Sequence, residues 1–260
     1  MFDLTAYLGG LVALVGLAVV GWGLSAALRN VGVVDVLWGL FFLVAVSTYG
    51  ALVPEAGPRA WLIVALVALW SLRLAGYIAW RSHGKPEDKR YAAIRRRNEP
   101  GFAWKSGYMI FGFQGLLAWI ISLPLLAAAA APTPLNLFDA AGVVLWLVGM
   151  VFEAGGDYQL ARFKADPENR GKILDRGLWR YTRHPNYFGD CCVWWGFYLV
   201  ALGGGGWWSV ASPLLMTFLL LKFSGVSLTE AGMAKDHPSY GDYQRRTNAF
   251  FPGPPKGSSP

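Results

Sequence analysis

The chain has 260 residues, of which 55% are hydrophobic and only 15% are charged. This composition excludes an ordinary soluble domain and indicates a polytopic membrane protein whose core forms in lipid. Membrane topology and attraction to anionic lipid explain the net charge of +7, so we expect membrane lipids and no nucleic acid as partners. Cys191 and Cys192 are adjacent and no Cys/His cluster has metal-ligand spacing, so we expect neither a disulfide nor a metal.

Seven apolar segments are long enough, or nearly so, to span a bilayer. They cover approximately residues 7–28, 33–53, 60–80, 108–131, 136–156, 187–203 and 207–226, and the sixth is short. We therefore predict an all-α fold, a bundle of seven transmembrane helices. No internal repeat or linker divides the chain, so we expect a single domain over residues 1–251, followed by a disordered cytoplasmic tail at 252–260.

Lys and Arg are concentrated in alternate connections between these segments. Residues 81–107 contain eight of them, 157–186 seven and 227–260 four, whereas 132–135 and 203–206 contain none. The positive-inside rule then predicts that the amino terminus lies outside and the carboxyl terminus in the cytoplasm. The first of these connections also contains a predicted short helix at 86–97 that starts at Pro86, and it either lies on anionic lipid or contributes to cofactor binding.

The second and third apolar segments contain ionisable side chains that a purely structural helix would avoid. Asp35 lies near the start of the second segment, one turn from Trp38. It is either a helix N-terminal charge or a buried neutral acid that donates a hydrogen bond to a substrate carbonyl. In the third segment Trp70, Arg73 and Tyr77 recur at spacings of three and four and so share one helical face. That face either lets Arg73 snorkel to the interface or presents a polar stripe to the bundle interior.

The densest polar motif lies between two hydrophobic stretches, at residues 176–190 (RGLWRYTRHPNYFGD). Its arginines suit phosphates, its tyrosines suit stacking, and Asn186 and Asp190, one turn apart, suit amide or ribose groups. Arg and aromatic residues also gather at membrane interfaces for topological reasons, but topology does not explain an acid beyond the basic run. We therefore interpret the motif as a site for an anionic cofactor.

Two more segments are rich in polar side chains. Glu153 and Asp157 are one turn apart at the inner end of the fifth apolar segment, and Lys164 follows them. Two acids that face a basic segment suit either a structural ion-pair network or recognition of ribose and amide groups. After the last apolar segment, residues 240–252 (YGDYQRRTNAFFP) form a tail that would close over a bound cofactor.

Residues 152–164 (FEAGGDYQLARFK), 177–190 and 240–252 together resemble the bacterial branch of the steroid 5α-reductase family. The resemblance covers most of the chain from Asp35 onward and is strongest over 152–252. It implies a seven-helix protein of the bacterial inner membrane, with cytoplasmic loops forming the cofactor site. It also implies an NADPH-dependent reductase of a carbon–carbon double bond conjugated to a ketone, with a steroid or an isoprenoid as the small, lipid-like enone substrate.

Carried over by position, the resemblance puts Asp35 near the glutamate that engages the substrate ketone, and Trp70 closest to the tyrosine that partners that glutamate. We assign catalytic roles to Asp35 and Tyr77, and substrate contacts to Trp38 and Trp70. The expected NADPH-binding residues are Arg73, Asp157, Tyr158, Lys164, Arg170, Lys172, Tyr181, Arg183, His184, Asn186, Tyr187, Asp190, Tyr243 and Arg246.

In the expected reaction, hydride passes from NADPH to the β-carbon of the enone. A protonated Asp35, together with Tyr77 or the Trp38 N–H, then stabilises the developing enolate by hydrogen bonding. The substrate would occupy an apolar cavity between helices that opens sideways to the bilayer.

Two other functions compete with this one. Residues 183–187 (RHPNY) also resemble the isoprenylcysteine carboxyl methyltransferases, which bind S-adenosylmethionine. That cofactor needs a site for one carboxylate and one amine, whereas NADPH brings a pyrophosphate and a further phosphate. Because NADPH has more anionic groups to bind, the surplus of cations favours the reductase. These cations are Arg73, Lys164, Arg170 and Lys172. A membrane scaffold without catalysis would leave charges such as Asp35 and Asp190 without a reason for their cost in lipid.

Overall fold

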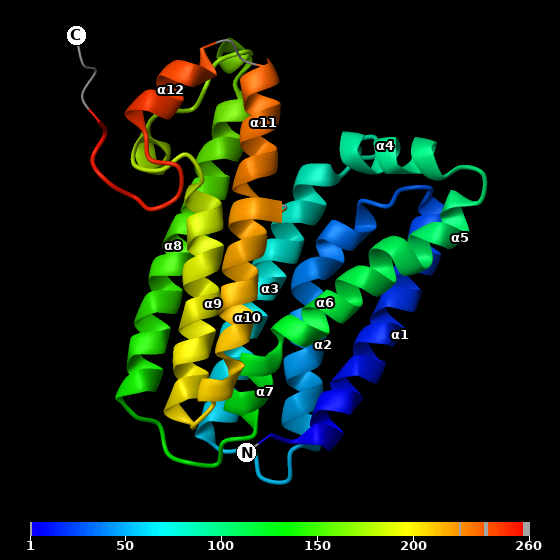
Figure 1. The fold of residues 1–260 in the computed structure, drawn as a ribbon, viewed down its shortest axis with the longest axis vertical. Coiled ribbons are helices and arrows are strands. Elements are labelled where there is room, and N and C mark those ends of the chain that lie inside the picture. Colours follow the sequence, from blue (N-terminus) through cyan, green and yellow to red (C-terminus); the bar gives the residue numbers. More distant parts are fainter. Residues whose placement is uncertain (1, 224, 237–238, 257–260) are drawn as a thin grey trace. The chain divides into compact units, whose positions relative to one another are not determined.

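The computed structural model describes residues 2–223, 225–236 and 239–256. All regular elements in this part of the chain are helices (Figure 1), which confirms the predicted all-α fold. The chain divides into two compact units, one formed by Met1–Asp139 and Val200–Ser212, the other by Ala140–Leu199 and Pro213–Pro260.

The first unit contains the helices of the amino-terminal half. They are α1 (Leu4–Leu28), α2 (Val33–Leu52), α3 (Pro58–Ser82), α4 (Lys89–Asn98), α5 (Phe102–Ser106), the π-helix η1 (Gly107–Gly112), α6 (Phe113–Ile121), α7 (Leu123–Ala129) and the short η4 (Trp207–Val210). The second unit contains most of α8 (Leu137–Ala165), α9 (Pro185–Gly203) and α10 (Ala211–Phe218). It also contains the shorter elements η2 (Pro167–Asn169), η3 (Gly177–Arg180), η5 (Leu219–Phe223), α11 (Val226–Asp236) and α12 (Tyr240–Arg246).

Four helices, α1, α2, α3 and α8, are long and apolar enough to cross a membrane. A fifth candidate is the pair Phe102–Ile121 and Leu123–Ala129, which is bent by 46°. Pro124 follows the bend, and because proline lacks a backbone N–H, it interrupts the helical hydrogen bonding there. The protein is therefore an integral, multi-pass membrane protein. The predicted sixth and seventh spans fall on α9 and on the shorter apolar helix Trp207–Phe223, and their crossing remains a prediction.

Aromatic side chains fill the core of the first unit. Phe41, Tyr49 and Trp70 are fully buried where α2 packs against α1 and α3. The Tyr49 hydroxyl lies 2.6 Å from the Ser122 Oγ. This hydrogen bond gives a polar partner to two hydroxyl groups that have no access to water.

A buried ion pair joins α3 to the first turn of α8. The Arg59 side chain is fully buried, and its Nε and Nη2 donate to the two carboxylate oxygens of Asp139 at 2.7 and 2.8 Å. Its Nη1 donates to Thr133 Oγ1 at 2.7 Å. Because each of the three guanidinium nitrogens donates to an acceptor, the cost of burying the charge is offset. This pair was not anticipated from the sequence.

The helix predicted at 86–97 begins three residues later than expected, at Lys89, and ends at Asn98. Asp88 is its N-cap, and the Asp88 side chain accepts a hydrogen bond from the Arg90 N–H at 2.8 Å. A capping aspartate defines the first turn more strongly than the preceding Pro86 does. Glu87 therefore remains outside the helix.

In the second unit α8 and α9 pack through glycines. A Cβ placed on Gly149 would lie 2.6 Å from the Gly189 carbonyl oxygen, and one on Gly196 would lie 2.8 Å from the Gly142 carbonyl oxygen. The glycines recur every seven residues on both helices, at 142, 149 and 156 of α8 and at 189 and 196 of α9. Small residues at this spacing let two helix backbones approach closely in lipid.

Candidate functional site

The second unit encloses a cavity of about 600 Å³ beside the end of α8. This volume lies within the range of roughly 300–1,000 Å³ that small-molecule sites occupy. Positively charged side chains dominate its polar lining. Its described walls include Lys164, Arg170, Lys172 and Arg183, against the single acid Asp166. The cavity can therefore attract an anionic ligand.

Six of the predicted cofactor residues line this cavity: Lys164, Arg170, Lys172, Arg183, His184 and Tyr243. Lys164, Arg170 and Lys172 are exposed, so their ammonium and guanidinium groups are accessible to a ligand. Trp179 and Tyr240 add aromatic surface to the same cavity. The arrangement combines cations for phosphate groups with flat rings for a nucleotide base or a nicotinamide.

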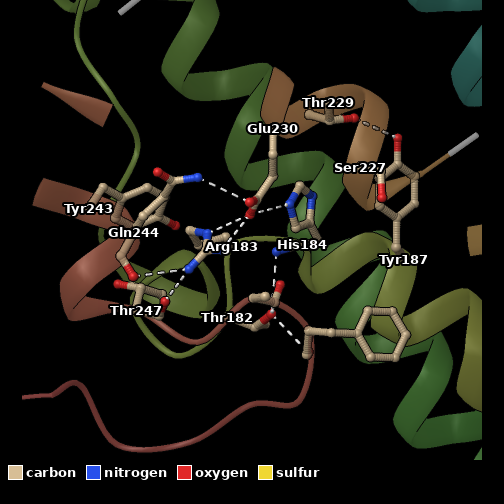
Figure 2. A network of polar contacts seen from close by, with 12 residues as sticks. Thr182, Arg183, His184, Tyr187, Ser227, Thr229, Glu230, Tyr243, Gln244 and Thr247 are labelled. Atoms are coloured by element: carbon tan, nitrogen blue, oxygen red, sulfur yellow. Dashed lines mark hydrogen bonds and ion pairs between the residues drawn. The ribbon is translucent and has the colours of Figure 1, made fainter. Parts of the chain in front are cut away.

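Arg183 is the centre of a hydrogen-bond network beside the cavity (Figure 2). Its Nε donates to Glu230 Oε1 at 2.6 Å, and its Nη1 donates to the carbonyl oxygens of Gln244 and Thr247. The Gln244 side-chain amide donates to the second Glu230 oxygen at 3.1 Å. The guanidinium is thereby neutralised by Glu230, and Arg183 joins the start of α9 to α11 and α12.

His184 completes the network from the next position in the chain. Its Nε2 lies 3.2 Å from Glu230 Oε1, and its ring stacks on Tyr187 with centroids 5.5 Å apart. Burial lowers the pKa of the His184 imidazole below its usual value, although Glu230 opposes this. Burial works to raise the pKa of Glu230, but the hydrogen bonds and charge of Arg183 hold it below its usual value. At neutral pH the pair is therefore a neutral imidazole that donates to a carboxylate.

The carboxyl-terminal segment holds the loop before α9 in place. The Arg183 N–H donates to the Asn248 carbonyl oxygen at 2.9 Å, and Thr182 Oγ1 donates to the Phe250 carbonyl oxygen at 2.8 Å. Farther along, the Gly253 and Lys256 N–H groups donate to backbone carbonyl groups within the same unit. Residues 257–260 of the predicted tail lie outside the described residues.

Asn186 and Asp157 meet at the contact between α9 and α8. The Asn186 side-chain amide donates to Asp157 Oδ1 at 3.3 Å, and Asp157 is buried. The Tyr187 hydroxyl lies 3.3 Å from Thr229 Oγ1, and Thr229 lines the cavity. Asp190 follows Asn186 by one turn of α9. The cavity wall, as described, does not include the four predicted residues of this contact: Asp157, Asn186, Tyr187 and Asp190.

Three other predicted cofactor residues lie away from the described wall of the cavity. Tyr158 and Tyr181 are 64% and 46% exposed. The Arg246 guanidinium lies 3.4 Å from the Asp175 carboxylate at the protein surface. The cofactor roles of these three residues remain predictions.

The first unit contains the five predicted residues that precede residue 80. The Tyr91 hydroxyl donates to Asp35 Oδ1 at 2.5 Å, and an Arg90 Nη2 lies 3.4 Å from the other Asp35 oxygen. Burial and the nearby carboxylate raise the pKa of Tyr91, which keeps its hydroxyl protonated as the donor. Trp38 packs edge-on against Phe42, with ring centroids 5.2 Å apart.

Trp70 and two arginines of α3 make contacts with aromatic rings. Trp70 is fully buried and contacts Phe42 with ring centroids 5.8 Å apart. Arg73 and Arg81 lie on either side of Tyr77, at 5.6 and 5.4 Å from its ring centroid. The predicted helical face of Trp70, Arg73 and Tyr77 therefore includes cation–π contacts within α3.

Sequence reasoning missed two residues of these clusters. Glu230 follows the last apolar segment, and its position in the sequence gave no signal that it pairs with the basic motif at 176–190. Tyr91 lies in the short basic helix α4, next to Arg90. No local spacing relates either residue to its partner, because Glu230 and Arg183 are 47 positions apart and Tyr91 and Asp35 are 56.

Comparison with known proteins gives a family model and a relative that each match most of the chain. A family model described as "Protein of unknown function (DUF1295)" matches residues 21–247. An uncharacterized protein of Schizosaccharomyces pombe is 26% identical over 269 residues, which cover 89% of this chain and 75% of that protein.

A shorter match connects the chain to steroid enzymes. The 3-oxo-5-alpha-steroid 4-dehydrogenases 1 of Mus musculus and Bos taurus are 41% and 36% identical to it over 58 residues. These residues are 22% of this chain and 23% of each dehydrogenase. No solved structure is significantly similar.

Proposed function

The chain belongs to the DUF1295 family, and we propose that it is an integral-membrane reductase that uses NADPH to reduce the carbon–carbon double bond of an enone lipid. The single observation that carries this proposal is the cation-lined cavity of the second unit. The partial similarity to 3-oxo-5-alpha-steroid 4-dehydrogenase 1 supports the same reaction class. The full fold that we propose has seven membrane spans, with the amino terminus outside and the carboxyl terminus in the cytoplasm.

The residues of the cavity fit NADPH by the chemistry of their side chains. Lys164, Arg170 and Lys172 would bind the pyrophosphate and the additional phosphate, because cations form charge-assisted hydrogen bonds with phosphate oxygens. Tyr243 would pack against a flat ring. The Arg183–Glu230 pair would hold the wall in shape, since its own charge is already neutralised. When bound, NADPH supplies a hydride.

Asn186 and Asp157 would position the amide end of the cofactor. Asn186 both donates to Asp157 and accepts from the Tyr187 N–H at 3.1 Å, so its side-chain orientation is defined on both sides. Asp190 would contribute a carboxylate one turn farther along α9. A side chain oriented in advance loses less entropy when it binds a ligand.

In the first unit we assign the acid of the reaction to Asp35, with Tyr91 as its positioning partner. A protonated Asp35 would donate a hydrogen bond to the ketone oxygen of the substrate as negative charge develops there. Tyr91 would hold the carboxyl group in one orientation through its hydroxyl group. The substrate that we propose is a steroid or an isoprenoid enone.

Ligand-induced stabilisation of the purified full-length protein tests the cofactor. A ligand at 100 times its Kd stabilises the folded state by about 2.7 kcal/mol. We expect NADPH to raise the melting temperature clearly, and NADH to do so much less because it lacks one phosphate. Equal shifts in melting temperature from the two dinucleotides would contradict the proposal that the cations of the cavity bind the additional phosphate of NADPH.

Substitutions locate the binding to the cavity. Arg170→Gln and Lys172→Gln should each reduce the NADPH shift, whereas Arg162→Gln should leave it unchanged, because Arg162 is an exposed cation of α8 outside the described wall. Asn186→Ala and Asp190→Ala should abolish the shift with expression largely intact. Normal NADPH binding by both of the last two variants would mean that the motif serves membrane topology alone.

The rival function is an S-adenosylmethionine-dependent methyltransferase. The motif shared with that class includes Arg183 and His184, and both are engaged by Glu230. The wall of the cavity also contains Arg170 and Lys172, and these two cations exceed what one carboxylate needs. A melting-temperature shift with S-adenosylmethionine and none with NADPH would replace the proposed function with this one.

A further inference from the structure

The first unit has an apolar groove of about 320 Å³ on its membrane-spanning helices. One wall follows α1 from Leu11 to Trp22, and the other follows residues 104–116 of α5, η1 and α6. Several lining side chains are exposed, with Val15 at 52%, Val19 at 55% and Leu116 at 47%. An elongated apolar groove on a membrane helix is suited to an aliphatic chain.

Missing side chains and a π-helix create this groove. Gly107, Gly112 and Gly115 lie in its wall, and Gly107 is in contact range of the Trp22 ring, where a Cβ would lie only 3.2 Å away. The π-helix η1 begins at Gly107, and π-helical turns inside α-helices are frequent at functional sites. The Trp22 Nε1 donates to the Ala103 carbonyl oxygen at 2.7 Å and closes this end of the groove.

The length of the groove matches one leaflet of a bilayer. Leu11 and Trp22 are separated by about 16 Å along α1 at 1.5 Å per residue. Half of a hydrocarbon core is roughly 15 Å thick. A single acyl chain of a lipid in one leaflet would therefore extend along the whole groove.

Positively charged side chains of α4 lie near the end of the groove that contains Trp22. An Arg95 Nη2 donates to the Arg29 carbonyl oxygen at 3.4 Å, so α4 is fixed at the carboxyl-terminal end of α1. Arg96 and Arg97 are exposed, and no acid in the described part of the chain pairs with them. The end of α1 lies about 9 Å beyond Trp22 at 1.5 Å per residue, which is enough to cross a polar headgroup layer of roughly 5–8 Å.

From these observations we propose that the groove is a binding site for one anionic glycerophospholipid, with an acyl chain along α1 and the headgroup phosphate on Arg96 and Arg97. The apolar lining selects the chain, and the two arginines select the charge. This site is independent of the cofactor cavity, because all its residues belong to the first unit.

Native mass spectrometry of the detergent-purified full chain, titrated with phosphatidylglycerol or with phosphatidylcholine of the same acyl chains, tests the proposal. We expect one phosphatidylglycerol molecule to be retained preferentially. The double variant Arg96→Gln/Arg97→Gln should bind it about 30-fold more weakly, which corresponds to about 1 kcal/mol per cation. The double variant Arg162→Gln/Lys256→Gln removes two exposed cations elsewhere and should bind it like the wild type.

Filling the groove tests the acyl chain separately. Val15→Trp/Val19→Trp should abolish the retained phosphatidylglycerol, and Leu116→Trp does the same from the opposite wall if the first variant folds poorly. Val12→Trp is the control, because Val12 is 73% exposed on α1 outside the groove. Wild-type retention by the folded groove variants would overturn the proposal. So would equal retention of the two phospholipids, or retention of an uncharged prenyl alcohol in their place.

Discussion

The Tyr91 hydroxyl donates a 2.5 Å hydrogen bond to Oδ1 of Asp35, which lies in the first turn of α2. The cap residue of α2 is Gly32, which makes no side-chain cap. The described hydrogen bonds of the Asp35 carboxylate come from the Tyr91 and Arg90 side chains, and not from first-turn N–H groups. This favours an acid held by a partner over a simple helix cap.

Substitution of Asp35 separates these two roles. If Asp35 donates a hydrogen bond to the ketone, turnover should fall in the order wild type, Asp35→Asn, Asp35→Ala, and the alanine variant should lose about a hundredfold or more. Tyr91→Phe should reduce turnover less, because it removes only the positioning bond. NADPH-dependent reduction of testosterone or progesterone, measured beside thermal unfolding, gives both quantities. A stable, NADPH-binding Asp35→Ala protein with near-normal turnover would eliminate the catalytic assignment.

The ion pair of Arg183 and Glu230 should be important for stability. Arg183 is buried and Glu230 is 19% exposed, so Glu230→Gln leaves a buried guanidinium without its counter-charge. We expect a loss of about 3 kcal/mol, which corresponds to a decrease in melting temperature of roughly 6–12 °C for a chain of this size.

Asp242→Asn provides the matched control for that substitution. Asp242 also pairs with an arginine, Arg245, but both side chains are more than 60% exposed. Solvent and salt screen an exposed pair, so this variant should change stability by less than about 1 kcal/mol. Similar losses in the two variants would contradict a special role for the Glu230 network.

The long apolar segments were predictable because period and composition define them without any tertiary information. Their ends depended on caps, as with Asp3, whose carboxylate accepts from the Ala6 N–H and starts α1 at Leu4 rather than near residue 7. The seven-residue glycine pattern of α8 and α9 was visible in the sequence but was not interpreted. The role of these glycines becomes clear only when α8 and α9 are known to pack against each other.

The sequence predicted the chemistry of the cofactor site but not which residues pair with its side chains. The basic motif at 176–190 indicated an anion site, and the cavity includes Arg183 and His184 from it. The sequence did not indicate that Glu230 neutralises Arg183, because this pairing depends on how α11 folds back against the motif. Contacts between distant segments therefore decide which cations are neutralised within the protein and which can bind a ligand.

The Glu230 network should also give the protein a characteristic pH dependence. His184 has a lowered pKa in the folded state, so its contribution to stability is complete above about pH 6.5, the usual histidine pKa. It is lost as pH falls from that value through the folded-state pKa. Glu230 likewise has a lowered pKa, and its contribution is present above about pH 4.5 and lost as pH falls further.

We therefore expect the melting temperature of the wild type to be flat above about pH 7.5 and to fall in two stages below it. His184→Gln should remove the first stage and retain the second, and Glu230→Gln should weaken the second. Differential scanning fluorimetry from pH 2.5 to 8 measures both, with the wild type as the reference for all other titrating groups. A first stage that persists unchanged in His184→Gln would assign it to another residue.

The contact between α8 and α9 gives the last prediction. A Cβ on Gly149 would lie 2.6 Å from the Gly189 carbonyl oxygen and 2.7 Å from the Val193 backbone nitrogen. Both are backbone atoms that cannot move aside alone, so Gly149→Ala should force the helices apart and cost about 1–3 kcal/mol. Gly16→Ala in α1 is the control, because a Cβ there meets open space. Alanine favours a helix over glycine by up to about 1 kcal/mol, so that variant should unfold at the same or a higher temperature. Thermal unfolding of the two variants in one detergent makes the comparison, and equal stability would mean that the close approach of α8 and α9 is not required for the fold.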